Sequence, residues 1–188
     1  GGLEITNDNV TVNIVELFGK QLVNLLQVLL FHSEKPVQKD ELIDILWPES
    51  KNPSSALKFS IFRLRAELNE IEFFKDKEVI VTTRKGYILN PNLDWNIDFV
   101  ELEKAYNQIN DGSELLDEKE FKTARKIFRL YQGRFYASPS QLHWILQKQE
   151  IFRQMYVKTM MRILLLIYAK TLWWDDAYEL SGGFNWTI

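Results

Sequence analysis

The 188-residue chain contains no cysteine, and it has neither a long apolar run nor an excess of positive charge. The absence of cysteine excludes disulfide bridges and thiolate metal sites, and it fits a reducing cytoplasm. The longest apolar run, residues 163–169, is far shorter than the ~20 residues that a membrane-spanning helix needs. No basic segment followed by an apolar one is visible at the start, so no export signal is expected. We therefore expect a cytoplasmic protein.

The charge balance excludes a generic polyanion-binding protein. Apolar residues make up 46% of the chain and charged residues 26%, which is typical of a folded globular protein, and the net charge is −3. Residues 52–88 carry seven Lys and Arg against five Asp and Glu, a local excess of only two positive charges. Because phosphate neutralisation supplies most non-specific affinity for DNA, any such affinity must come from the placement of a few basic side chains.

The first part of the chain predicts a β-hairpin followed by three helices. Apolar and polar residues alternate on both sides of Asn7-Asp8-Asn9, a turn-forming cluster, as expected for two short strands. Apolar residues then recur at helical spacing, and Trp47-Pro48 ends the second helical segment. Ser54 or Ser55 is a candidate N-cap for the third. The expected elements are a hairpin over 3–14 and helices over 20–31, 39–46 and 54–68.

A second hairpin follows these helices. Residues 79–83 and 87–89 are rich in β-forming side chains, and Arg84-Lys85-Gly86 joins them, with a glycine suited to a positive φ in the turn. Three helices and a hairpin with a basic tip are typical of a winged helix-turn-helix, which presents its last helix to DNA. We therefore expect a DNA-binding domain over residues 1–90, with helix 54–68 in the major groove and the wing 79–89 on its flank.

The remaining sequence predicts an all-α module. Residues 91–96 are interpreted as a linker, and the periodicity from residue 98 onward is helical. Paired helices with alanine and tyrosine at inward positions indicate tetratricopeptide-like hairpins over residues 97–188. The helical pattern stops at residue 181, so we expect a shortened module. The expected helices cover about 99–110, 121–131 and 138–171, with a fourth beginning at 175.

The exposed side of helix 54–68 has two interpretations. Lys58, Arg63 and Arg65 are candidates for contact with guanine or phosphate. Alternatively, they form a solvated face on which Arg63 pairs with the residue four positions later. Phe59 and Phe62 are expected to be covered by the wing or by the second domain, although an exposed phenylalanine could contact thymine methyl groups. Arg84 and Lys85 at the hairpin tip are expected to reach the minor groove or its flanking phosphates.

In this arrangement the chain resembles the SARP-type transcriptional activators, which join an OmpR-like winged helix to a bacterial transcriptional activator domain. Order and spacing, rather than any single motif, carry the resemblance, and it covers nearly the whole chain. Its matching segments are Gly1-Gly2-Leu3-Glu4-Ile5, KPVQKDELIDILWPE (residues 35–49), Arg63-Leu64-Arg65, Gly86-Tyr87, YQGRF (residues 131–135), Trp144, Arg153, Tyr156 and Tyr168.

The resemblance implies double-stranded DNA as a ligand, a homodimer on DNA, and contact with RNA polymerase or with a sensor or receiver domain. The sequence departs from the family where basic residues usually begin the first helix, since only Lys20 remains there. Leu172 replaces a glycine expected in the helical repeat. The implied DNA-binding residues are Lys20, Ser54, Ser55, Lys58, Phe62, Arg63, Arg65, Arg84 and Lys85.

Other classes of function have weaker support in the sequence. No phosphate-binding loop, nucleophile motif or ligand cluster around either histidine is visible, so we expect no enzyme activity, no cofactor and no metal. A degenerate winged helix serving as a protein-interaction adaptor is the alternative function, because the domain is acidic and its outer helix carries two phenylalanines. Aromatic side chains near the C-terminus are candidates for a partner interface, with internal packing as the equal alternative: Trp173, Trp174, Phe184 and Trp186.

Overall fold

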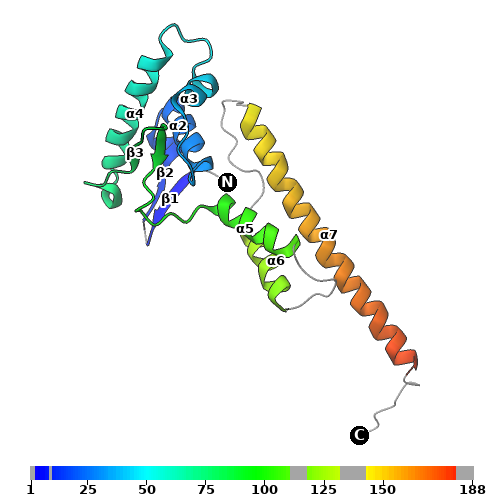
Figure 1. The fold of residues 1–188 in the computed structure, drawn as a ribbon. Helices are drawn as coiled ribbons and strands as arrows, with labels where there is room; N and C mark the ends of the chain where they lie inside the picture. Colours follow the sequence, from blue (N-terminus) through cyan, green and yellow to red (C-terminus); the bar gives the residue numbers. More distant parts are fainter. Residues whose placement is uncertain (1–2, 9, 111–117, 132–142, 181–188) are drawn as a thin grey trace. The chain divides into compact units, whose positions relative to one another are not determined.

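The computed structural model describes residues 3–8, 10–110, 118–131 and 143–180 (Figure 1). These residues form two compact units, which divide between Ile97 and Asp98. The first unit is a winged helix and the second is all α-helical, as the sequence predicted. Trp95, in the segment interpreted as a linker, contacts the first unit: its indole Nε1 donates a 2.9 Å hydrogen bond to the Asn90 carbonyl oxygen, and its ring packs against Phe74.

The first unit follows the predicted order of elements. Two further elements, a short helix over residues 14–17 and a 3-10 turn over residues 72–74, are too short to show a hydrophobic period and were not predicted. The side chain of Asn13 caps the short helix by accepting a hydrogen bond from the amide of Val15. An antiparallel hairpin of β1 (Glu4–Asn7) and β2 (Val10–Asn13) leads into α1 (Ile14–Leu17), α2 (Lys20–Phe31), α3 (Lys39–Leu46), α4 (Pro53–Asn69), a 3-10 turn (Glu72–Phe74), β3 (Ile80–Thr82) and β4 (Tyr87–Leu89).

The core of this unit forms where α4 packs on α2 and α3. Four apolar residues at helical spacing face inward from α4, and each is at most 2% exposed. Burial of one such side chain contributes roughly 1.5–3 kcal/mol, so this stripe fixes the rotation of α4 about its axis. The opposite face of α4 is thereby directed to solvent. The inward residues are Leu57, Ile61, Leu64 and Leu68.

The start of α4 differs from the prediction. Asn52 occupies the N-cap and Pro53 the first helical position, so neither Ser54 nor Ser55 is the cap. Proline suits this position because its φ is already helical and its missing N–H would have no partner there. Both serines instead lie exposed in the first turn.

The wing is tied to the segment before α3. The amide of Val37 donates to the carbonyl of Tyr87 at 2.8 Å, and the amide of Tyr87 donates back at 3.0 Å. Gly86 lies against this bridge with φ at 150°, and a Cβ atom there would overlap the Val37 carbonyl oxygen. The glycine is therefore required both by its backbone conformation and by the close approach of another chain segment.

The second unit packs three helices around a small apolar core. Phe99 and Phe152 lie with ring centroids 6.0 Å apart, and Tyr131 stacks on Tyr156 at 4.7 Å. Lys126 on the second helix donates to Glu101 on the first at 2.6 Å. This hydrogen bond, with a weaker one from Lys104, lowers the pKa of Glu101. The helices are α5 (Asp98–Asn110), α6 (Glu118–Leu130) and α7 (His143–Leu180).

The long helix α7 corrects one prediction. A break near residue 171 and a fourth helix from residue 175 were expected, but α7 continues without interruption to Leu180. Neither glycine nor proline occurs between Thr171 and Leu180, and Leu172, a good helix former, stands where the repeat glycine was expected. The predicted start of this helix near Pro139 lies outside the described residues.

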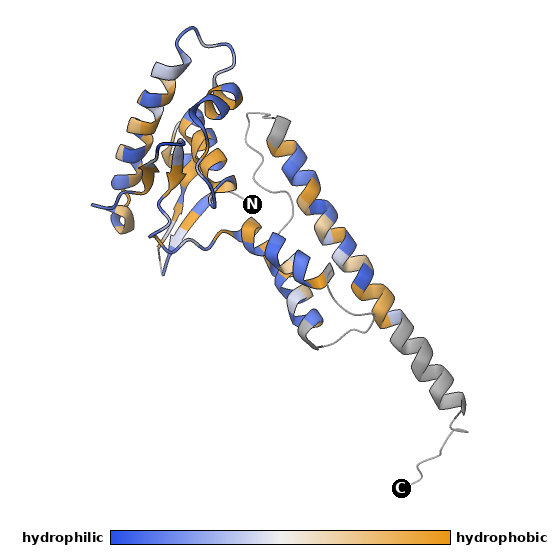
Figure 2. Ribbon diagram, viewed as in Figure 1, coloured by the Kyte–Doolittle hydropathy of each residue, from blue (hydrophilic) through white to orange (hydrophobic). Residues whose placement is uncertain are grey.

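The middle of α7 carries an apolar face over residues 157–168, which the hydropathy colouring makes visible (Figure 2). Its members are 37–66% exposed: Val157, Met161, Leu164, Leu165, Ile167 and Tyr168. Charged residues interrupt it, and no helix among the described residues is both long and apolar enough to cross a membrane.

Replacing Gly86 by serine is expected to lower the free energy of unfolding by more than about 1 kcal/mol, because the new Cβ must displace the Val37 carbonyl and strain the backbone. Gly19→Ser is the matched control, since nothing lies within 4 Å of a Cβ at Gly19 and serine is a good N-cap for α2. Thermal and urea denaturation measure both. Equal losses in the two variants would contradict this account of the wing.

Candidate nucleic-acid interface

The solvent-facing side of α4 combines basic and aromatic residues. Lys58 and Arg63 are exposed on it. Phe59 is 61% exposed and Phe62 is 70% exposed. The expectation that the wing covers the two phenylalanines is therefore wrong, and cover by the second domain stays a prediction. Helical spacing explains their position, because both lie on the side of α4 opposite its buried stripe.

The N-terminal ends of two helices add polar groups to the candidate surface. Ser54 and Ser55 lie in the first turn of α4, where backbone N–H groups lack intrahelical acceptors. Lys20 is exposed at the first position of α2, directly after Gly19. Helix N-termini favour anions through their free N–H groups and the helix dipole, so both positions suit phosphate contact.

Arg65 has a different environment from the other basic residues of α4. Its Nε and Nη2 donate to the Ile80 carbonyl oxygen at 3.0 and 2.7 Å, and Nη2 also donates to Thr82 Oγ1 at 2.8 Å. The side chain is 36% exposed, and a carboxylate oxygen of Glu78 lies 4.0 Å away. These hydrogen bonds join α4 to β3, the first strand of the wing. The structure thus gives Arg65 a positioning role, which the sequence analysis did not predict.

Arg63 forms the pair that the alternative interpretation expected. Its Nη2 lies 3.3 Å from Glu67 Oε1, and both side chains are substantially exposed. Exposed pairs four residues apart on a helix contribute only about 0.3–0.5 kcal/mol. Because the pair contributes so little free energy, Arg63 can leave Glu67 and contact a phosphate or a base instead.

The wing tip presents two exposed basic side chains, Arg84 and Lys85. The turn beneath them is fixed by Thr83, whose Oγ1 accepts from the amides of Lys85 and Gly86 at 3.2 and 3.1 Å. The amide of Thr83 also donates to the Gly86 carbonyl at 2.8 Å. The two basic side chains therefore project from a rigid turn, which suits contact with a fixed phosphate position.

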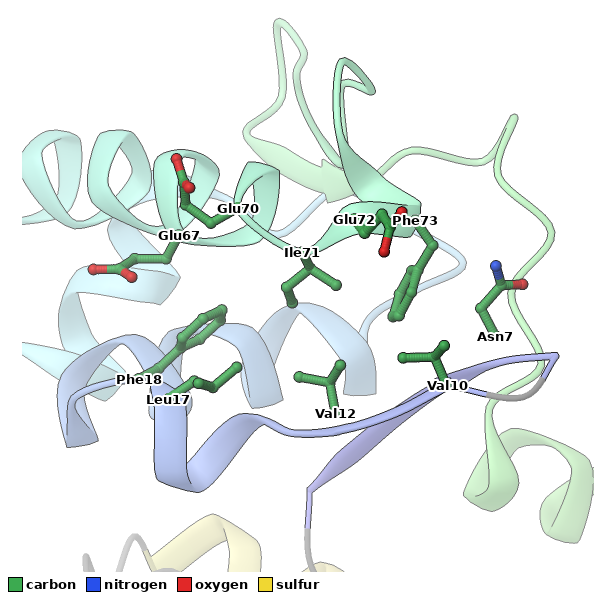
Figure 3. A pocket seen from close by; sticks show the side chains of 10 residues that line it. All are labelled: Asn7, Val10, Val12, Leu17, Phe18, Glu67, Glu70, Ile71, Glu72 and Phe73. Carbon is green, nitrogen blue, oxygen red and sulfur yellow. The ribbon is translucent and has the colours of Figure 1, made fainter.

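A groove at the other end of α4 has the wrong chemistry for DNA. It has a volume of about 640 Å³, and it lies between the β1–β2 hairpin with α1 on one side and the end of α4 with the 3-10 turn on the other (Figure 3). Val10, Val12 and Ile71 contribute apolar surface. Three carboxylates also line it and would repel phosphate: Glu67, Glu70 and Glu72.

The predicted aromatic partner interface stays untested. Trp173 and Trp174 belong to α7, but their side chains lie outside the described part of the structure. Phe184 and Trp186 lie wholly outside the described residues. Within the described ranges, no three His, Asp or Glu side chains gather in a way that could hold a metal ion.

These elements define a winged helix-turn-helix followed by a helical module. Residues 15–89, which run from α1 to β4, match the family of the transcriptional regulatory protein C-terminal domain. The fold is also similar to that of Mycobacterium tuberculosis EmbR in complex with a low-affinity phosphopeptide, with a TM-score of 0.59 and 17% identity. That match covers 95% of this chain and 49% of the EmbR chain, so the present chain spans about half its length.

The family match over residues 15–89 supports a DNA-binding transcriptional regulator. At 17% identity, the likeness to EmbR shows a common fold and nothing about ligands. A comparison with curated proteins gives no sequence match.

Replacing Arg65 by methionine should detach the wing from α4. The Ile80 carbonyl would lose a charged donor, and we expect a loss of about 1.5–3 kcal/mol in the free energy of unfolding. The amide hydrogens of Thr83 and Asn90, which bond within the wing, should also exchange faster with solvent. Arg63→Met is the matched control and should change stability by less than about 0.5 kcal/mol. Similar behaviour of the two variants would contradict the role assigned to Arg65.

Proposed function

We propose that the chain regulates transcription by placing α4 in a major groove of double-stranded DNA, with the wing on the flanking backbone. The observation that carries the proposal is the solvent-facing side of α4, which lies beside a wing held by Arg65 and tipped with Arg84 and Lys85. Lys58 and Arg63 supply contacts to bases or phosphates from the same face. The family match over residues 15–89 supports this assignment.

The backbone contacts in this proposal come from a few separate positions. Helix N-termini at Ser54, Ser55 and Lys20 bind phosphates through main-chain N–H groups as well as side chains. Arg84 and Lys85 bind the backbone beside the groove. A surface with so few positive charges neutralises few phosphates, so its affinity is modest and the slope of log affinity against log salt is shallow.

A second copy of the chain would compensate for this modest affinity. Two linked domains bind adjacent sites far more tightly than one, because the second binding event becomes intramolecular. We propose that the helical unit supplies this link as a homodimer, or that it contacts RNA polymerase or a sensor or receiver domain. The exposed apolar residues of α7 support a role in protein contact.

A protein-interaction adaptor is the second candidate function. Arg65 is engaged with β3 and Arg63 with Glu67, while the two exposed phenylalanines make the outward face of α4 unusually apolar. Such a face also suits a protein partner. In this case the chain would retain a stoichiometric protein and would bind DNA no better than its charge allows.

The test begins with selection of bound duplexes from a random DNA pool at low salt, followed by fluorescence anisotropy with the enriched sequence. The variant Arg84→Ala/Lys85→Ala should bind at least about tenfold more weakly, and each lost phosphate contact should reduce the slope of log affinity against log salt by about 0.9. Lys75→Ala/Lys77→Ala is the matched control, because it removes two exposed positive charges that lie outside both α4 and the wing tip.

Two results would contradict the proposal. One is failure to enrich any sequence at low salt. The other is an equal loss of affinity in the wing variant and its control, since binding would then depend on total charge alone. Retention of a stoichiometric protein partner in either case would favour the adaptor.

A further inference from the structure

The outward face of α4 has a composition that is unusual for a surface expected to read hydrogen-bonding groups. Its central positions are apolar: Phe59 and Phe62 are among the most exposed large hydrophobic residues of the winged-helix unit. The polar side chains, Lys58 and Arg63, flank them. Nothing in the packing of the unit explains the phenylalanines, because the core is already filled by the buried stripe on the other side of α4.

Only one base edge in the major groove offers an apolar group. The C5 methyl group of thymine projects there, whereas the other bases present hydrogen-bond donors and acceptors. A phenylalanine in the groove leaves those donors and acceptors unpaired, which is unfavourable, but it removes a thymine methyl group from water. We propose that Phe59 and Phe62 determine the specificity of this chain by contacting thymine methyl groups. This inference rests on the proposed function.

The spacing of the two residues restricts the target further. They are three positions apart on α4, so their Cα atoms are separated by about 4.5 Å along the helix axis. Successive bases of one DNA strand are separated by about 3.4 Å. A helix lying along the groove therefore places the two rings over methyl groups of adjacent or next-but-one thymines. The target site contains a short run of thymines on one strand, and Lys58 and Arg63 contact groups at its edges.

Uracil provides a direct test, because it pairs with adenine as thymine does and lacks only the methyl group. The duplex enriched by selection is synthesised with each thymine replaced by deoxyuridine, one position at a time, and its affinity is measured by fluorescence anisotropy. Affinity should fall about fourfold at each contacted position, the value expected for one buried methyl group. The sensitive positions should be neighbours on one strand.

The variant Phe59→Ser/Phe62→Ser completes a double-mutant cycle. It should bind the thymine duplex more weakly than the unmodified chain does, and it should no longer distinguish thymine from deoxyuridine at the sensitive positions. Val10→Ser/Leu17→Ser is the matched control, because it replaces two apolar residues that are 52% and 58% exposed elsewhere in the same unit. The control should keep the full discrimination. Circular dichroism establishes that each variant is folded.

The possible failures are distinguishable. Binding of the selected duplex with no loss at any deoxyuridine position would overturn the thymine inference and leave the DNA-binding proposal intact. Discrimination that survives Phe59→Ser/Phe62→Ser would also overturn it, because another group would then read the methyl. If no duplex is enriched, both proposals are wrong. If Phe59→Ser/Phe62→Ser loses a protein partner that the unmodified chain retains, the two phenylalanines belong to the adaptor function.

Discussion

The guanidinium group of Arg65 holds the two halves of the candidate interface together. It binds the carbonyl oxygen of Ile80 through two nitrogen atoms, and so it fixes β3 beside α4. In the antiparallel hairpin this carbonyl lies on the edge directed away from β4, where no strand partner can reach it. This contact and the backbone bridge between Val37 and Tyr87 together set the angle between α4 and the wing. The position of Arg84 at the wing tip depends on that angle.

The two faces of α4 have separate roles: the buried face stabilises the fold, and the outward face is the proposed recognition surface. The buried stripe of Leu57, Ile61, Leu64 and Leu68 supplies the packing energy and sets the rotation of the helix. The outward residues contribute little to folding, so their chemistry is free to be selected for binding. That chemistry is sparse in charge and rich in aromatic surface. The proposed regulator therefore gains its specificity from apolar contact and its affinity from a second copy or a partner.

Periodicity predicted most of the fold, because the buried stripes of α2, α3 and α4 recur at the helical spacing. Leu172, a good helix former, was consistent with an uninterrupted α7. The expected repeat pattern nevertheless led to the wrong prediction of a break near residue 171. Arg65 could not be assigned in the same way, since its acceptor is a main-chain carbonyl 15 residues away. The exposure of Phe59 and Phe62 was mispredicted because a sequence does not show how far a wing extends over its neighbouring helix.

The central claim is that α4 and the wing tip together form the surface that meets DNA. The most direct measurement is the change in amide chemical shifts when the isotopically labelled chain is titrated with the selected duplex. The account predicts large changes in the first ten residues of α4 and in residues 83–86, with little change along the acidic groove lined by Glu70 and Glu72. Changes confined to the groove or to the helical unit, with α4 unaffected, would contradict it.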